Sequence, residues 1–160
     1  MSAIDDEKIV EDGGGWAGTC YCNSVSFRIR SDCVPHISLY CHCESCRRAH
    51  AAPLYHVVYV KEDDIEWIKG AGTLSHFRKN AEDPKVPTRV FCSICGSRMM
   101  NILHNKPWYG FFPATLRDDV QHNLPDVFKP TMHYCGQEAV LDLDTLDKDL
   151  PVVGNETLPA

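Results

Sequence analysis

Residues 92–96 read Cys-Ser-Ile-Cys-Gly, and this stretch does most to decide the fold. Two cysteines separated by two residues can bring their thiols to one metal ion, and the glycine that follows frees the backbone for a turn. A second pair, Cys20 and Cys22, falls at the end of a predicted strand, where alternating side chains place both thiols on one face. The two pairs supply four ligands, which make a closed tetrahedral site. They predict a metal ion that ties distant parts of the chain together.

Three further cysteines, Cys41, Cys43 and Cys46, form a local group between these pairs. Three protein ligands with an open fourth position are typical of a catalytic zinc ion, whereas closure by a nearby histidine would make a second structural site. The spacing alone leaves both interpretations open. The remaining cysteines, Cys33 and Cys135, are isolated in the sequence, and we interpret them as buried small apolar residues or bystanders.

The composition is that of an ordinary globular domain, with 160 residues, 44% of them hydrophobic and 24% charged. No apolar run approaches the roughly 18 residues needed to cross a membrane, and the acidic N-terminus lacks the features of a signal peptide. We therefore expect a cytoplasmic protein with no membrane partner. In that compartment thiols stay reduced, so paired cysteines indicate metal binding rather than disulfides.

The charge balance argues against nucleic acid as a partner. The formal net charge is −6, and residues 1–15 contain one lysine against five acidic residues. An acidic surface does not attract a phosphate backbone. We expect a small molecule rather than a nucleic acid as the partner, and the sequence does not indicate an oligomeric state.

The hydrophobic pattern predicts one mainly β domain over residues 16–150, between a flexible arm at 1–15 and a C-terminal tail at 151–160. Short runs rich in β-branched and aromatic residues alternate with turn residues. We expect one or two short helices, at residues 43–52 and 114–119. The predicted strands lie at 25–29, 54–60, 64–68, 73–78, 88–91, 99–103 and 108–112.

The order of these cysteine groups resembles that of the glutathione-dependent formaldehyde-activating enzyme family, which also includes centromere protein V. The resemblance covers roughly residues 16–150. The residues that carry it are Gly18-x-Cys20-x-Cys22, Cys41-His42-Cys43-x-x-Cys46-Arg47-Arg48, Pro53, Trp67-x-x-Gly70, Arg89-x-Phe91-Cys92-x-x-Cys95-Gly96-Ser97 and Pro130-x-x-His133.

The resemblance implies an Mss4-like fold, in which small antiparallel sheets are held together by zinc. It also implies two zinc ions per chain with different roles. The structural ion would be held by Cys20, Cys22, Cys92 and Cys95, and the catalytic ion by Cys41, Cys43 and Cys46.

The sequence departs from the family pattern at three places. Asn23 stands where a glycine usually follows the first cysteine pair, and asparagine tolerates a positive φ better than most residues. His50-Ala51 replaces Ser-Gly, and residues 114–117, Ala-Thr-Leu-Arg, replace Gly-x-Leu-Asp. The last two departures favour, as an alternative, a substrate that differs from the one in the family's name.

Three thiolates leave a zinc ion with a formal charge of −1, which makes it a weak Lewis acid but a good partner for a further thiolate. This favours carbon–sulfur lyase chemistry on a thiol adduct, such as one of glutathione. The alternatives are a pathway-specific lyase or isomerase with a changed substrate, and a non-catalytic zinc scaffold or binding module.

Three residues beside the last ligand are further candidates for the catalytic site. Arg47 and Arg48 could offset the negative charge of the site or bind a substrate carboxylate, or they could be solvated surface residues. His50 could be an acid–base group, a fourth zinc ligand or a surface residue. The sequence leaves these alternatives open.

Overall fold

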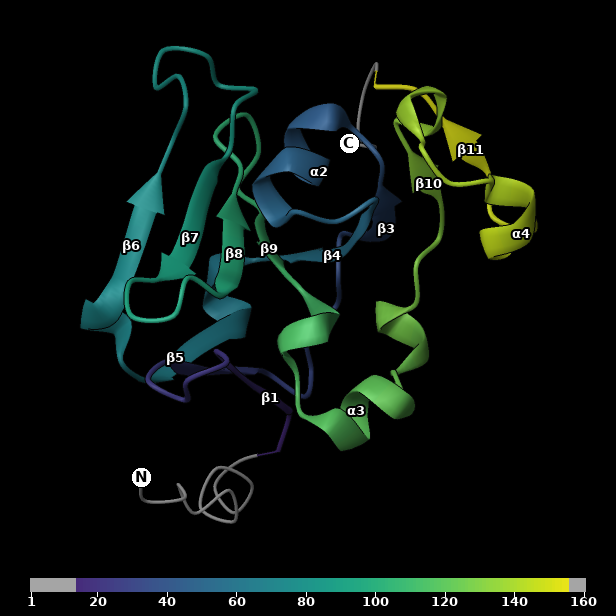
Figure 1. Ribbon diagram of the computed structural model, residues 1–160. Helices are drawn as coiled ribbons and strands as arrows, with labels where there is room; N and C mark the ends of the chain where they lie inside the picture. The colour runs from purple at the N-terminus through teal and green to yellow at the C-terminus, as the bar shows by residue number, and fades with distance from the viewer. Residues whose placement is uncertain (1–13, 156–160) are drawn as a thin grey trace.

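The computed structural model describes residues 14–155 and confirms the predicted mainly β fold. It contains a small sheet and a large sheet, accompanied by short helices (Figure 1). In their order across the small sheet, the strands are β1 (Trp16–Thr19), β2 (Ser26–Ile29) and β5 (Ile65–Lys69). Across the large sheet they are β11 (Val152–Val153), β10 (His133–Tyr134), β3 (Ile37–Cys41), β4 (Tyr55–Val60), β9 (Tyr109–Phe111), β8 (Arg98–Ile102), β7 (Thr88–Cys92) and β6 (Leu74–Phe77).

The described α-helices are short, and two of them overlap the predicted helical segments. These are α2 (Glu44–His50) and α3 (Asp118–His122), while α4 (Leu143–Asp147) is additional. Helix α2 begins after Cys43, whose sulfur accepts a hydrogen bond from the backbone N–H of Cys46, and it ends at Ala51 with φ 50°. Single 3-10 turns lie at Glu62–Asp64, Ala71–Thr73, Pro113–Thr115, Asp126–Phe128 and Gly136–Glu138.

The small sheet packs closely because one of its residues has no side chain. Phe27 on β2 is fully buried, and its ring meets that of Trp67 edge to face at 5.9 Å. A Cβ atom at Gly18 would come within 2.5 Å of the Phe27 ring. Only glycine therefore allows β1 to lie directly over this core ring.

The large sheet is antiparallel from β3 to β6, but β10 and β11 pair in parallel at its other edge (Figure 1). Tyr134 on β10 lies opposite Cys41 on β3. The backbone N–H of His42 donates to the Tyr134 oxygen at 3.0 Å. This pairing brings the C-terminal part of the chain to the segment that carries the local cysteine group.

Two apolar clusters fill the interior. The first surrounds Phe27, Phe111 and Phe128, and the rings of Phe111 and Phe128 meet at 5.2 Å. The second includes Tyr55 and Phe112 and packs against Cys41 and Cys46. The packed side chains of the second cluster therefore support the local cysteine group.

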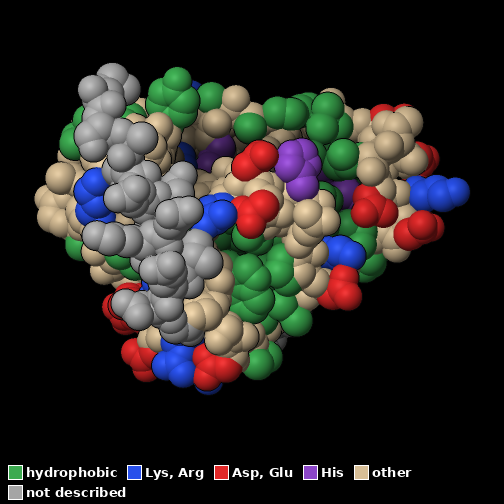
Figure 2. Space-filling view, turned by 90° about the horizontal axis from the view of Figure 1, so that it is seen from below, with side chains coloured by type: hydrophobic (Ala, Val, Ile, Leu, Met, Phe, Trp, Pro, Cys, Tyr) green, Lys and Arg blue, Asp and Glu red, His purple; other side chains and the backbone are tan. Residues whose placement is uncertain are grey.

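The predicted arm and tail are only partly described. Residues 1–13 and 156–160 lie outside the described residues, while residues 152–153 form β11. On the face seen in Figure 2, acidic side chains of the described part are interspersed with lysine and arginine side chains. Among residues 14–155, no helix has the length and apolar character needed to span a membrane.

Candidate metal centres

The first candidate centre unites the two distant cysteine pairs. Cys20 follows β1, Cys92 ends β7, and their thiols lie with those of Cys22 and Cys95 within 4.8 Å of one another. The sulfur atoms of Cys20 and Cys22 are 3.5 Å apart, and those of Cys22 and Cys92 are 3.9 Å apart. A tetrahedral zinc ion with bonds of about 2.3 Å needs sulfur atoms about 3.8 Å apart. The donor set therefore fits such an ion.

Turns of the backbone bring these four thiols together. Asn23 has φ 59°, so it adopts the left-handed conformation for which glycine is usual, as its position predicts. Gly96 has φ 75°, and its N–H donates to the Cys92 oxygen at 2.9 Å. Ser97 joins the two pairs, because its hydroxyl oxygen accepts from the N–H of Tyr21 at 3.0 Å. Each pair is therefore preshaped before an ion binds.

Local hydrogen bonds favour the ionised form of Cys95 in this centre. Burial opposes ionisation of Cys95, but its hydrogen bonds with Ser97 lower the pKa of the thiol to about 6. Burial raises the pKa of Cys20 to about 12. Metal binding must therefore displace a proton from the buried Cys20 thiol, while Cys95 is readily deprotonated near neutral pH.

The second candidate centre is built where β3 meets α2. Cys41 ends the strand, Cys43 caps the helix, and Cys46 lies in its first turn. Their three thiols lie within 4.8 Å of one another, and the sulfur atoms of Cys41 and Cys43 are 3.6 Å apart. This separation also matches the edge of a tetrahedral zinc site, about 3.8 Å. Cys41 and Cys46 are buried and Cys43 is half-buried.

Cys135 is buried, as one of the two sequence-based interpretations expects, and it lies beside this second centre. Its side chain is 2% exposed, and its thiol neighbours those of Cys41 and Cys43. The hydrogen bonds with Cys135, Cys41 and Cys46 lower the pKa of Cys43. The negative charge of the group therefore settles first on the Cys43 sulfur. No local pattern in the sequence indicates this contact, because it depends on the pairing of β10 with β3.

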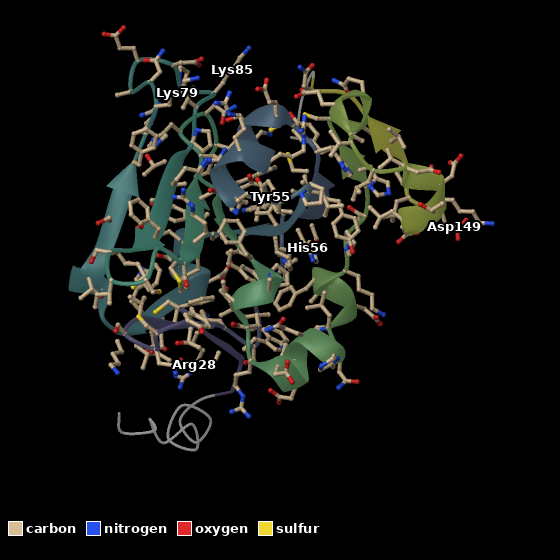
Figure 3. The ribbon with its side chains drawn as sticks, viewed as in Figure 1. Arg28, Tyr55, His56, Lys79, Lys85 and Asp149 are labelled. Carbon is tan, nitrogen blue, oxygen red and sulfur yellow. The ribbon has the colours of Figure 1, made fainter. Side chains whose placement is uncertain are left out.

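A buried cation supports the second centre from β7. Arg89 is 7% exposed and donates to the sulfur of Cys46 at 3.4 Å and to the Asn101 Oδ1 at 3.0 Å. Asn101 in turn donates from Nδ2 to the Tyr55 hydroxyl at 3.2 Å. Tyr55 lies at the centre of the molecule beside α2 (Figure 3). Arg89 belongs to the family motif, which by itself assigns it no role. A charged residue inside an apolar strand nevertheless indicates a buried contact with a polar or charged partner.

The two arginines that follow Cys46 face different surroundings. Arg47 is half-buried, and its Nε donates to the His42 backbone oxygen at 2.9 Å, which fixes the loop between two thiols. The Arg48 side chain is 80% exposed and pairs with Glu44 one turn away at 3.3 Å. Arg48 thus lies on the solvated surface of α2, whereas Arg47 holds the backbone of the site.

His50 is half-buried and packs against the second cluster. Its ring stacks on Tyr55 at 4.3 Å and meets Phe112 edge to face at 4.8 Å. Burial, helped by the charges of Arg89 and Arg98, lowers the pKa of His50 to about 4, so the ring is neutral at pH 7. Its Nε2 is buried, without a hydrogen-bond partner among residues 14–155. His50 lies outside the group of thiols that could share an ion.

His42, another histidine of the motif, helps to hold the backbone in place and lies outside the groups of thiols that could share an ion. The Nε2 of His42 and the Nδ1 of His133 are 3.0 Å apart, and both rings are fully buried. The Nε2 of His133 lies 3.1 Å from the backbone oxygen of Asp147. The pair therefore links the loop of the second centre to β10 and α4.

Comparisons with known proteins agree with this architecture. A crystal structure of a Rhodobacter sphaeroides protein is similar to the chain with a TM-score of 0.54 and 18% sequence identity. The alignment covers 86% of this chain and 99% of that protein, so the two chains share a fold. The mainly β architecture and the two cysteine sets are consistent with the predicted Mss4-like fold. Among curated proteins, no significant match is found. The family model described as "Glutathione-dependent formaldehyde-activating enzyme" matches residues 16–137. The chain is therefore a member of the glutathione-dependent formaldehyde-activating enzyme family.

Proposed function

We propose that this protein is a zinc-dependent enzyme that makes or breaks a carbon–sulfur bond in a small thiol adduct, such as one of glutathione. The three converging thiols of Cys41, Cys43 and Cys46 carry the proposal. Membership of a family named for glutathione-dependent formaldehyde activation supports the substrate class. Thiolate ligands favour zinc, and the sulfur separations at both centres suit its tetrahedral geometry.

The proposed roles of the two centres differ. The set of Cys20, Cys22, Cys92 and Cys95 offers four thiols and would serve the fold. The local set would serve the reaction, where a bound zinc ion would hold a substrate thiol as its nucleophilic thiolate. We expect about two zinc ions per chain by elemental analysis, and one ion or none would contradict this assignment.

The surrounding side chains control the charge of the reaction site. Arg89 places a buried positive charge beside the Cys46 sulfur, which offsets the negative charge that several thiolates accumulate. The Arg47 side chain holds the loop between Cys41 and Cys43 in place through the His42 oxygen. Arg89 and Arg47 would therefore keep the thiols ionised and correctly spaced, and neither would touch the substrate.

His50 is the proposed polar group that faces the substrate side of the cluster. Its neutral ring can accept or donate one hydrogen bond, and its Nε2 lacks a partner in the described part of the chain. The stacking on Tyr55 fixes the ring plane. His50 would thus hydrogen bond to a hydroxyl group of the adduct through Nε2.

The proposed reaction is balanced without a further reactant. In the breaking direction, the carbon–sulfur bond of a hydroxymethyl thioether opens, the hydroxyl oxygen becomes the carbonyl oxygen of the aldehyde, and its proton ends on the sulfur of the released thiol. The reverse direction adds the thiol to the aldehyde. No electrons are gained or lost, so neither an oxidant nor a reductant is needed.

Exchange spectroscopy by NMR tests this function with glutathione and formaldehyde. The zinc-loaded protein should accelerate the interconversion of these compounds with their adduct, and Cys43→Ser should abolish the acceleration. Cys33→Ser is the matched control, because Cys33 is buried in the other apolar cluster. Equal exchange rates with and without wild-type protein would contradict the proposed substrate.

A changed substrate is the second candidate, and His50-Ala51 favours it. This departure from the family pattern lies directly against the second centre, where His50 packs on Tyr55 and Phe112. If glutathione and formaldehyde are not interconverted, a panel of other thiol adducts is the next assay. Retention of two zinc ions without turnover of any adduct would instead favour a non-catalytic scaffold.

A further inference from the structure

Cys135 is held beside the second centre by the pairing of two strands. It directly follows β10, in which Tyr134 lies opposite Cys41. The backbone N–H of His42 donates to the backbone oxygen of Tyr134 at 3.0 Å. This hydrogen bond holds the backbone segments that carry Cys41 and Cys135 next to each other. The position of Cys135 is therefore set by the sheet and not by an independent loop.

A second contact ties the turn after Cys135 to the start of α2. The Oε2 of Glu138 accepts from the backbone N–H of Glu44 at 2.7 Å, and the N–H of Glu138 donates to the Cys135 oxygen at 3.0 Å. At Gly136 there is no room for a Cβ beside Val152 of β11. The turn that follows Cys135 therefore packs against both α2 and β11.

The backbone of Cys135 adopts a conformation that cysteine rarely takes. Its φ is 56°, in the left-handed region that favours glycine. Residues in such conformations persist where the surrounding structure determines them, and they gather at functional sites. Here the conformation places a buried thiol beside two other thiols, those of Cys41 and Cys43.

We propose that Cys135 is the fourth sulfur ligand of the metal ion at Cys41, Cys43 and Cys46 in the resting protein. Three thiols already lie within 4.8 Å of one another, and the Cys135 thiol neighbours two of them, Cys41 and Cys43, outside that group. A movement of Cys135 toward Cys46 would complete a tetrahedron with edges of about 3.8 Å. This inference concerns the coordination of the ion and does not rest on turnover of any substrate.

Cadmium-113 NMR tests the proposal on the full chain loaded with ¹¹³Cd²⁺, because the shift of this nucleus reports the number of sulfur ligands. Wild-type protein should give two resonances, both in the range of four-thiolate sites. Cys135→Ala should move one resonance upfield and leave the other in place. Cys33→Ala is the matched control and should move neither, since Cys33 belongs to neither group of thiols that could share an ion.

The wild-type spectrum decides the matter even if Cys135→Ala fails to fold. A wild-type resonance in the range of mixed oxygen–sulfur or nitrogen–sulfur sites would overturn the proposal. A zinc competition assay gives an independent measure. Loss of a direct ligand should weaken one zinc site by more than the about 10–100-fold that is typical of changes outside the ligand shell.

Discussion

Arg89 and Cys46 form a buried contact between a guanidinium and a sulfur at 3.4 Å. Burial alone would lower the pKa of Arg89, but Cys46, when ionised as a metal ligand, raises it, so the guanidinium stays charged. A buried charge is tolerated only with a partner, and here each group supplies the partner of the other. The contact also links the two centres, because β7 carries both Arg89 and Cys92.

Replacing Arg89 should weaken the second centre selectively. Arg89→Met leaves the Cys46 thiolate and the Asn101 amide oxygen without their donor, so we expect unfolding to become easier by about 3–5 kcal/mol. Zinc at the second centre should bind about 10–100-fold more weakly, as measured by chelator competition.

The matched control for Arg89 is Arg48→Met. Arg48 is exposed, and among residues 14–155 it pairs with Glu44, so its loss should change stability by less than about 1 kcal/mol. Equal effects of the two substitutions would show that the buried contact is not important.

Loss of one cysteine should have different consequences at the two centres. Cys92→Ser removes a ligand that joins distant segments, and structural zinc typically contributes about 10–16 kcal/mol of apparent binding energy, so this variant should be unfolded by circular dichroism. Cys43→Ser lies in a local group supported by the core, so it should keep the wild-type spectrum and lose activity. A folded, zinc-replete Cys92→Ser protein would contradict the division of roles.

A glycine at position 51 should stabilise the protein. Ala51 ends α2 with φ 50°, where the family usually has glycine, and this conformation costs a residue with a Cβ about 1 kcal/mol. Ala51→Gly should therefore raise the free energy of unfolding in urea by about 0.5–1 kcal/mol. Ala49→Gly, inside the same helix, is the control and should lower it by a similar amount.

Stability should fall as the pH drops below neutral, in part because of His56. Burial lowers its pKa to about 4, below the ordinary value of 6.5, so the unfolded chain binds more protons than the folded one between these values. The contribution of His56 is complete above pH 6.5 and is lost progressively as the pH falls toward 4. From pH 7 to 5, this amounts to about 2 kcal/mol.

His56→Gln isolates this effect, because acid also releases metal from wild type and variant alike. His56 contacts Ser38 and Tyr40 rather than the thiols, so both centres are retained in the variant. Urea unfolding at several pH values should show a shallower loss of stability for His56→Gln. Parallel curves for the two proteins would contradict the expectation.

Cysteine spacing predicts both thiol sets because the ligands of each pair or group are close in sequence. The strongest strand patterns also correspond to real strands, as for residues 25–29 and 54–60, which contain β2 and β4. The positive φ of Asn23 is likewise visible in the sequence, since few other residues can replace glycine there.

Contacts between distant segments could not be predicted in the same way. Strand β10 has only two residues, too few for a hydrophobic pattern, yet it brings Cys135 to the second centre. The burial of His50 depends on stacking against Tyr55, which only the packing of α2 on β4 creates. Such features follow from tertiary structure and leave no local signal.

The parallel pairing of β10 with β3 also has a consequence for the order of events during synthesis. Cys41, Cys43 and Cys46 leave the ribosome about 90 residues before Cys135. At about 5–20 residues per second, this interval lasts roughly 5–20 seconds. Throughout it the nascent chain presents three of these sulfurs without the fourth, so an ion captured early would be more open to exchange than one in the finished protein.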